Sequence, residues 1–313
     1  MNQCPVCKGS SFENWGLARD VEYRTSTKTF EYLVCNSCDS LVLPDPPKDY
    51  LAEIYPANYY TCDANSGLVG LIKSKIDRRM VGRWLNQFSN MAKIQNFHMG
   101  DFGGGSGYFA EICLKIEKKI SAEVIDFDAN PIQKKTNGIK FINCNLNDSF
   151  PDSKYNFIVA WNLLEHLVSP EDFLTSCFNS LDEEGILCIQ TPNHENAFAR
   201  LTQKSYWGGL HTPRHFVIYS PEHLVDSLKR KGFEIVEEKF VQDAHFQTVS
   251  ICKILGLDRR VSSERSILNT YSYKLLLPII AFISILSSRF IPTGQIQIIA
   301  RKPSNAYSSP KSN

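Results

Sequence analysis

The sequence predicts an α/β fold, a doubly wound parallel sheet preceded by a small cysteine-rich unit. Apolar runs of strand length alternate with segments of helical periodicity from residue 94 onward. The first run ends in the glycine-rich stretch DFGGGSG, Asp101–Gly107, and two C-x2-C pairs occupy the first 38 residues. Strands that alternate with helices indicate a parallel sheet that binds its ligands beyond the carboxyl ends of the strands.

The predicted strands are short apolar runs, at residues 94–102, 121–128, 139–145, 155–161, 185–193, 233–240 and 294–302. Helices are predicted at residues 107–119, 169–181 and 220–232. The last two begin with Ser-Pro, so Ser169 and Ser220 are expected to cap their N-termini. Gly232 stands where a glycine commonly ends a helix.

Composition limits the function classes that fit. The chain has 313 residues, 43% hydrophobic and 21% charged, with a formal net charge of +1. This charge provides no global positive field to gather nucleic acid. The N-terminus lacks the basic and apolar regions of a signal peptide, so a cytoplasmic location is expected.

One late apolar run, Leu275–Leu286, bears on where the protein acts. It is shorter than the roughly 20 apolar residues that a membrane-spanning helix needs. We expect a buried core or interface helix. Peripheral contact with a membrane surface is the alternative.

Two cysteine pairs predict a metal site in the N-terminal unit. Four of the ten cysteines form two C-x2-C knuckles, made by Cys4, Cys7, Cys35 and Cys38. Four thiolates from two such turns suit a closed, structural, tetrahedral Zn²⁺ site. The alternating pattern of TKTFEYLVC between the knuckles favours the β-hairpin of a zinc ribbon.

The domain organisation follows from these features. We expect a zinc ribbon at residues 1–45 and a linker with a helical cover at 46–95. The main domain is expected at 96–245, with a substrate-binding insertion at 194–219. Residues 246–313 would supply an apolar helical segment, the last core strand and a flexible tail.

The glycine-rich stretch suits a ligand that approaches the backbone closely, because glycine has no Cβ. The segment GSGYFA also satisfies the dinucleotide pattern G-x-G-x-x-A, and Asp128 supplies an acid about 20 residues later. However, a carboxylate at Asp101 repels a pyrophosphate and favours a ligand that carries an amino group. A cofactor other than NAD is therefore preferred, with NAD kept as the alternative.

The frame Asp101-x-Gly103-x-Gly105-x-Gly107 resembles motif I of the class I S-adenosylmethionine (SAM) methyltransferases. VIDFDANP resembles their second-strand motif, whose ribose-binding acid is Asp128 by position, with Asp126 where many relatives have glycine. NCNLND and WNLLEH resemble the regions after the third and fourth strands. The resemblance implies these cofactor-binding residues: Asp101, Gly103, Gly105, Gly107, Asp128, Asn145 and Asn162.

The stretch HTPRHFVIYSPEHL resembles a subgroup that also carries an N-terminal zinc ribbon and methylates sugars and other small metabolites, often in surface-polysaccharide pathways. The resemblance extends from Cys4 to about Lys302. It implies SAM as cofactor, structural zinc, and a nucleotide- or lipid-linked sugar as acceptor.

Methyl transfer to a hydroxyl or an acidic carbon needs a base, and histidine suits that role near neutral pH. The candidate catalytic residues are Glu165, His166, His211 and His215. The insertion also offers Tyr206, Trp207 and Arg214 as possible contacts for a sugar ring or a phosphate. Tyr59 and Tyr60 are candidates for closing over the cofactor.

Other functions remain open at this stage. In one alternative the substrate is RNA and the ribbon binds it, although the basic residues of the ribbon are balanced by acids. A quinone-type ring is another possible acceptor, since LEH occurs in such enzymes and the apolar run suits a membrane. In a non-catalytic alternative, the ribbon is an interaction module beside a domain that has lost its ligand.

Overall fold

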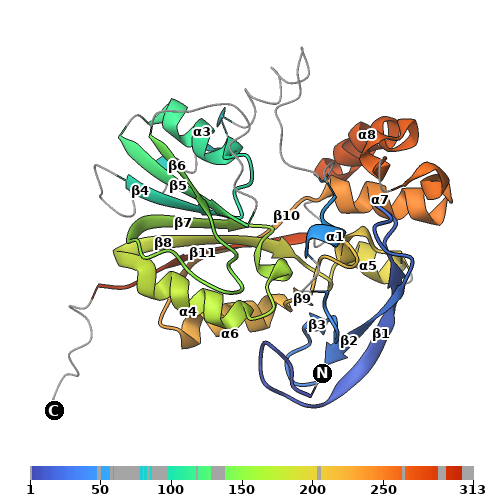
Figure 1. Cartoon of the computed structure of the whole chain (residues 1–313), viewed down its shortest axis with the longest axis horizontal. Coiled ribbons are helices and arrows are strands. Elements are labelled where there is room, and N and C mark those ends of the chain that lie inside the picture. Colours follow the sequence, from blue (N-terminus) through green and yellow to red (C-terminus); the bar gives the residue numbers. More distant parts are fainter. Residues whose placement is uncertain are drawn as a thin grey trace.

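A seven-stranded sheet forms the centre of the protein, here described from a computed structural model (Figure 1). The structure describes residues 2–47, 51–56, 59, 78–79, 81–82, 85–86, 97–117, 119–127, 138–202, 206–262, 265–287 and 294–304. Most of the predicted helical cover at 46–95, and also Tyr60 and Asp128, lie outside these residues.

The central sheet has the strand order β10-β11-β8-β7-β4-β5-β6. Its strands are β4 (Phe97–Phe102), β5 (Ile120–Asp126), β6 (Ile139–Asn143), β7 (Tyr155–Trp161), β8 (Leu181–Pro192), β10 (Glu234–Val241) and β11 (Gln295–Arg301). Neighbouring strands pair in parallel from β8 through β7 and β4 to β6, whereas β11 pairs antiparallel with β8 and β10. The predicted α/β class and the predicted strands are therefore confirmed, with β8 starting earlier than expected.

Helices cover both faces of this sheet (Figure 1). Helix α3 (Tyr108–Ile116) buries Ile112 and Cys113 against one face. Helices α4 (Pro170–Ser180) and α6 (Pro221–Arg230) bury their apolar side chains against the other face. All three helices lie where the sequence predicts them.

The predicted caps differ between α4 and α6. The Ser220 side chain accepts a hydrogen bond from the backbone N–H of His223, 3.3 Å away, as expected of an N-cap. Gly232 has a φ of +97° beyond the end of α6, which confirms its role at the C-terminus. Ser169 precedes α4 but makes no side-chain capping bond, so that part of the prediction is wrong.

A second, four-stranded sheet carries the cysteines. Strands β1 (Phe12–Arg19) and β2 (Thr29–Cys35) form the predicted antiparallel hairpin. Strand β3 (Leu41–Val42) adds to β2, and β9 (Val217–Ile218) pairs with β3. Because β9 belongs to the insertion of the main domain, the N-terminal unit and the insertion share one sheet.

The remaining described elements lie around the hairpin and beside the main sheet (Figure 1). The helices are α1 (Leu51–Ile54), α5 (Ala197–Leu201), α7 (Ala244–Ile254) and α8 (Tyr271–Ser287). The 3-10 turns are η2 (Leu164–His166), η3 (Gly208–Leu210), η4 (Leu257–Arg260) and η5 (Ile267–Asn269). Helix α7 packs against both η3 and α8, so it connects the insertion to the apolar helix.

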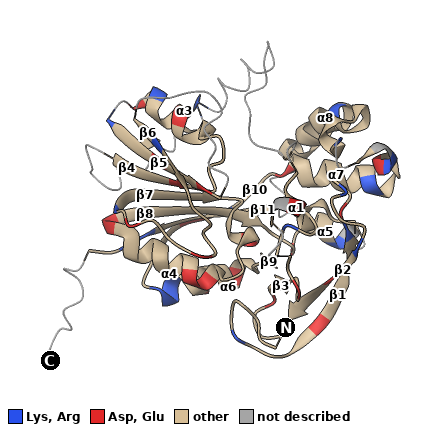
Figure 2. Ribbon diagram, viewed as in Figure 1, with Lys and Arg blue, Asp and Glu red and all other residues tan. Residues whose placement is uncertain are grey.

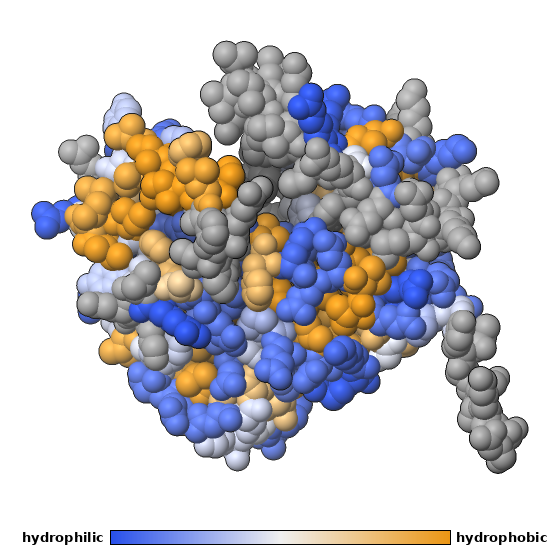
Figure 3. Space-filling model, turned by 180° about the vertical axis from the view of Figure 1, so that it is seen from behind, coloured by the Kyte–Doolittle hydropathy of each residue, from blue (hydrophilic) through white to orange (hydrophobic). Residues whose placement is uncertain are grey.

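Helix α8 contains the apolar run 275–286 and exposes much of it. Leu275, Phe282 and Ile285 are each 64–68% exposed. Figure 3 shows the resulting hydrophobic patch at the upper left. The expectation of a helix buried in the core of this chain is therefore wrong. Within the described residues, no helix is long and apolar enough to span a membrane.

Candidate functional site

The glycine-rich loop links β4 to α3 at the carboxyl end of β4, between β7 and β5. Gly103, Gly105 and Gly107 all have φ between +50° and +75°, in the left-handed region that favours glycine. At Gly104 a Cβ would come within 2.6 Å of the Asp101 carboxyl carbon. The loop therefore requires glycine for its conformation and for its close approach to Asp101.

Asp101 lies beneath this loop rather than in the open pocket. Its side chain is buried, and its Oδ2 has no hydrogen-bond partner within the described part of the chain. Burial, with a contribution from Asp126, raises the pKa of Asp101 to about 7. An unpartnered buried carboxylate oxygen is an unsatisfied acceptor, which a donor bound in the loop would relieve.

A pocket opens beside the loop at the carboxyl ends of β4 to β7. Among the predicted cofactor-binding residues, Gly103, Asn145 and Asn162 line it, and His166 lies on its wall. Asp126 also lines the pocket and accepts a hydrogen bond from the Gly105 backbone N–H at 3.0 Å. Asp101, Gly105 and Gly107 are not in the wall itself, and Asp128 is not described.

The three predicted histidines converge next to this pocket. The ring centroid of His166 lies 4.7 Å from that of His215, and His211 lies 5.1 Å from His215. They come from η2 and from the insertion after β8. The structure thus brings together residues that are up to 49 positions apart in sequence, from His166 to His215.

His166 and His215 are held in the neutral state. Burial, followed by His211, lowers the pKa of His166 to about 3. Burial and the two neighbouring histidines lower the pKa of His215 well below its usual value. Glu165, fully buried beside them, has its pKa raised to about 8 by burial.

His211 has different partners. Its Nδ1 lies 2.7 Å from Oε1 of Glu22, a buried carboxylate on the segment between β1 and β2. Its Nε2 lies 3.2 Å from the hydroxyl of Tyr59, which lines the pocket. Other groups, His211 among them, hold the pKa of Glu22 well below its usual range although burial opposes this. These two contacts hold the His211 ring between Glu22 and Tyr59.

Most side chains of the insertion from Trp207 to Val217 are buried, so this segment does not form an exposed lid over a substrate. Arg214 is fully buried, and its guanidinium donates to Asp20 Oδ2 at 3.0 Å and to the Ile54 carbonyl at 2.7 Å. Trp207 is also buried, against Trp15 and Phe246. Neither side chain is available to a sugar or a phosphate, so the expectation that they contact substrate is wrong.

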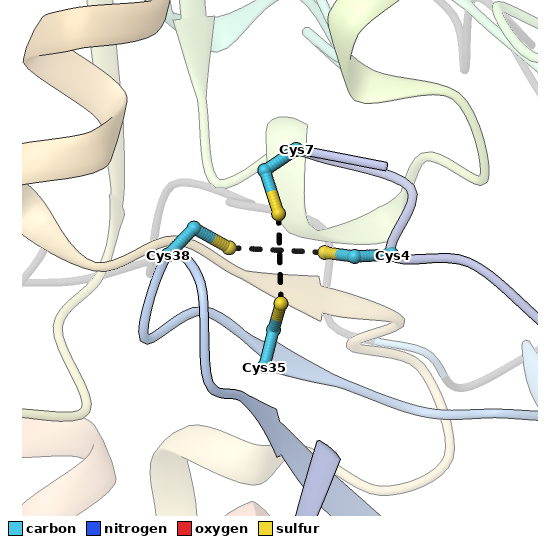
Figure 4. A group of neighbouring side chains, drawn as sticks. All are labelled: Cys4, Cys7, Cys35 and Cys38. Atoms are coloured by element: carbon cyan, nitrogen blue, oxygen red, sulfur yellow. Dashed lines mark hydrogen bonds between the residues drawn. The ribbon is translucent and has the colours of Figure 1, made fainter. Parts of the chain in front are cut away.

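The four N-terminal cysteines point toward a common centre (Figure 4). The Sγ atoms of Cys4 and Cys38 are 3.8 Å apart, and those of Cys7 and Cys35 are 3.5 Å apart. A tetrahedral ion with metal–sulfur bonds of about 2.3 Å places its sulfurs about 3.8 Å apart. The donor set and its spacing therefore fit Zn²⁺.

Sequence reasoning missed the aromatic wall and the role of the hairpin. Tyr55 and Phe127 line the pocket, and the Tyr55 hydroxyl lies 2.8 Å from His166 Nδ1. Glu22 lies 189 positions before His211 and carries no local motif. For Tyr55, the one signal in the sequence is the aromatic content of the segment YPANYY, residues 55–60.

Among the helices, α6 carries charges of both signs, whereas the charged residues of α4 are acidic and the lysine of α7 is basic (Figure 2).

Comparison with known proteins gives one match to a family. Residues 98–238 match a family described as a methyltransferase domain. No curated protein sequence matches the chain significantly.

Solved structures resemble the chain at low identity. A SAM-dependent methyltransferase from Archaeoglobus fulgidus has a TM-score of 0.45 at 21% identity, over 75% of this chain and 100% of its own. The N-methyltransferase NodS from Bradyrhizobium japonicum WM9, in complex with S-adenosyl-L-homocysteine, has a TM-score of 0.44 at 12% identity over 82% and 98%. The [4+2]-cyclase SpnF has a TM-score of 0.47 at 16% identity over 72% and 82%. At these scores the likenesses carry no argument about the reaction.

Proposed function

We propose, from the match of residues 98–238 to a methyltransferase domain, that this chain is a class I SAM-dependent methyltransferase that methylates a nucleotide- or lipid-linked sugar in surface polysaccharide biosynthesis. The observation that carries this proposal is that the glycine loop and the histidine cluster meet at one pocket. The glycine loop after β4 opens into a pocket, and His166 on the wall of that pocket leads to the histidine cluster.

We assign SAM to the loop and the pocket. Gly103, Gly105 and Gly107 would let the backbone bend under the methionine part, with Asp101 supporting the polar end. Asn145 and Asn162 stand where the adenosine part would lie, and Asp128 is the proposed ribose partner. SAM supplies an activated methyl group on a sulfonium, so the chain's main task is to align donor and acceptor.

The base that we favour is His211. The contact of its Nδ1 with Glu22 Oε1 at 2.7 Å orients the ring, whereas burial opposes protonation of His166 and His215. His211 Nε2 reaches the pocket through the Tyr59 hydroxyl at 3.2 Å. A proton from the acceptor would pass to Tyr59 oxygen as the Tyr59 proton passes to His211 Nε2.

The first test is calorimetric titration of zinc-loaded protein with S-adenosylhomocysteine and, separately, with NAD. We expect micromolar binding of S-adenosylhomocysteine and no binding of NAD. The reverse result would identify the loop as a dinucleotide site and overturn the proposal. Sugar nucleotides would then be screened for methyl transfer from labelled SAM.

The role of His211 has its own test once an acceptor is found. His211→Ala should lower transfer at least 100-fold while S-adenosylhomocysteine affinity stays within twofold, since a general base contributes about 10²–10⁴-fold. His223→Ala is the matched control, a histidine on α6 outside the pocket. Full activity in His211→Ala would remove the base assignment.

The four cysteines and α8 complete the proposal. We assign a structural Zn²⁺ to Cys4, Cys7, Cys35 and Cys38, and peripheral membrane contact to the exposed face of α8. The α8 patch favours a lipid-linked acceptor, because it lets the enzyme sit where such a substrate resides. Phe282→Ser should reduce co-sedimentation with anionic vesicles, and equal sedimentation of variant and wild type would contradict membrane contact.

A further inference from the structure

We infer that Glu165, His166 and His215 form a second metal site, which takes a divalent transition-metal cation of the Zn²⁺ or Mn²⁺ type. Each of the three offers one donor atom, and these atoms all lie within 4.8 Å of one another. The site is separate from the four cysteines. It deepens the proposed function, on which its catalytic role rests, but cation binding can be tested without any acceptor.

The carboxylate has one oxygen held and one unused. Glu165 Oε2 accepts a hydrogen bond from Thr191 Oγ1 at 2.9 Å. Among the residues that the structure describes, Glu165 Oε1 has no hydrogen-bond partner, although the side chain is fully buried. Its nearest charged or chargeable neighbour is His215 Nε2, 3.8 Å away, which is too far for a hydrogen bond. A buried carboxylate oxygen without a partner is costly, and a cation would satisfy it.

Both imidazoles present a lone pair. Nδ1 of His166 lies 2.9 Å from the Arg214 carbonyl, and Nδ1 of His215 lies 2.7 Å from the Gly209 carbonyl. A carbonyl only accepts, so these contacts favour the tautomer in which Nδ1 carries the proton, and the Tyr55 hydroxyl, 2.8 Å from His166 Nδ1, is able to accept from it as well. In the neutral ring Nε2 is then unprotonated. Metal-bound histidines commonly donate their other ring N–H to a backbone carbonyl in this way.

The donor set selects the class of cation. Two imidazoles and one carboxylate suit Zn²⁺, Mn²⁺ or Fe²⁺ better than Mg²⁺ or Ca²⁺. Bonds of about 2.0–2.2 Å place neighbouring donors roughly 3.3 Å apart, so the side chains need to close inward around the ion. The Arg214 guanidinium, the nearest fixed cation of the insertion, is already paired with Asp20.

The position of the site gives the cation a function. Three protein ligands leave coordination positions open, as in catalytic rather than structural sites. His166 lies in the pocket wall, so those positions are accessible from the side of the acceptor. A hydroxyl bound there would have a lowered pKa. As its oxygen forms a bond to the methyl carbon, the carbon–sulfur bond breaks, the proton goes to the His211 relay and neutral S-adenosylhomocysteine leaves.

Calorimetric titration with Zn²⁺ tests this site, using protein whose cysteine site is already filled with one zinc per chain. We expect wild type and His223→Ala to bind one further ion. Glu165→Gln and His166→Ala should each weaken that binding at least tenfold, because each removes one of three ligands. His166 is only partly buried, so its replacement tests the site even if Glu165→Gln folds poorly.

Absence of a second ion in the wild-type protein would overturn the proposal, as would equal affinity in wild type, Glu165→Gln and His166→Ala. Titration of the same samples with S-adenosylhomocysteine separates this failure from a failure of the proposed function. A protein that binds S-adenosylhomocysteine but no second ion loses only the metal site.

Discussion

The side chain of Arg214 shows how a single residue can hold the functional site together. Its guanidinium bonds to Asp20 from the hairpin, to the Ile54 carbonyl from α1 and to the Thr212 carbonyl of its own segment. It also lies over the Tyr23 ring, 4.7 Å from the centroid. These contacts provide hydrogen-bond acceptors and a counter-charge for the buried guanidinium. The backbone carbonyl of Arg214 lies 2.9 Å from Nδ1 of His166 and so orients the His166 ring.

Removing the partner charge should be costly. Asp20→Asn leaves Arg214 buried with its charge unpaired, and we expect a loss of about 3–5 kcal/mol in the free energy of unfolding. Urea denaturation checks this value. Asp39→Asn, an exposed change on the same hairpin unit, is the control and should lie within about 0.5 kcal/mol of wild type. Equal stability of both variants would show that the Arg214 charge needs no partner.

Asp101 should make the stability of the ligand-free protein depend on pH. Burial raises its pKa from 3.8 to about 7. The protonated form is thus favoured by folding, and its contribution, complete below pH 3.8, is lost as the pH rises through 7. We expect this contribution alone to lower Tm by a few degrees between pH 5 and pH 8. The lowered pKa values of His166 and His215 act with the opposite sign, so the contribution is read as the difference from a variant that lacks the carboxyl group.

The variant Asp101→Asn tests the source of that pH dependence. The Tm of this variant should fall less over the same pH range. Some dependence on pH should remain, because burial raises the pKa of Asp243 to about 6 and this group titrates with the same sign. Calorimetric scans at four pH values would measure both slopes. Identical slopes would assign the effect to other groups.

At the level of elements, α4 and α6 share a start signal but not a cap. Both begin with Ser-Pro-Glu. In α6 the Ser220 hydroxyl accepts from the His223 N–H and also donates to the Cys38 carbonyl at 2.8 Å. In α4 the Ser169 backbone, with φ −120° and ψ 66°, leaves its side chain without a capping bond.

This difference gives a matched pair of substitutions. Ser220→Ala should destabilise the protein by about 1–2 kcal/mol, because it removes a cap and leaves the buried Cys38 carbonyl without this donor. Ser169→Ala should change stability by less than about 0.5 kcal/mol. Chemical denaturation of the two variants in parallel checks the contrast. A larger effect at Ser169 would mean that its side chain caps α4 in solution.

At the scale of the whole molecule, the cysteine-rich unit is built into the site. Its strand β3 pairs with β9 from the insertion, and the Ser220 and Cys38 contact adds a second connection. Asp20 and Glu22, between β1 and β2, reach Arg214 and His211. Helix α3 packs separately, in the cluster around Met99 and Val124.

Zinc removal should therefore affect the two halves of the site differently. After chelation we expect faster hydrogen exchange at residues 12–42 and, with them, at 207–219, because the two share a sheet. Exchange in β4 and α3, and the affinity for S-adenosylhomocysteine, should change little. Hydrogen exchange with mass spectrometry measures both regions together. Loss of protection confined to 12–42 would show that the insertion is held independently.

The sequence alone determined the features that depend on local pattern. Alternating apolar runs predicted the strands, Ser-Pro and Gly232 marked helix ends, and Asp101–Gly107 marked the turn from β4 into α3, because each depends on neighbouring residues. The spacing of Cys4, Cys7, Cys35 and Cys38 likewise predicted their convergence.

Only the tertiary structure decided the contacts between distant residues. It paired Glu22 with His211, buried Arg214 and Trp207, and left the apolar face of α8 exposed. Such contacts depend on how sheets and helices pack, and no local periodicity encodes which side chains then meet. For the same reason, only the fold brought the unpartnered Glu165 oxygen next to two neutral histidines.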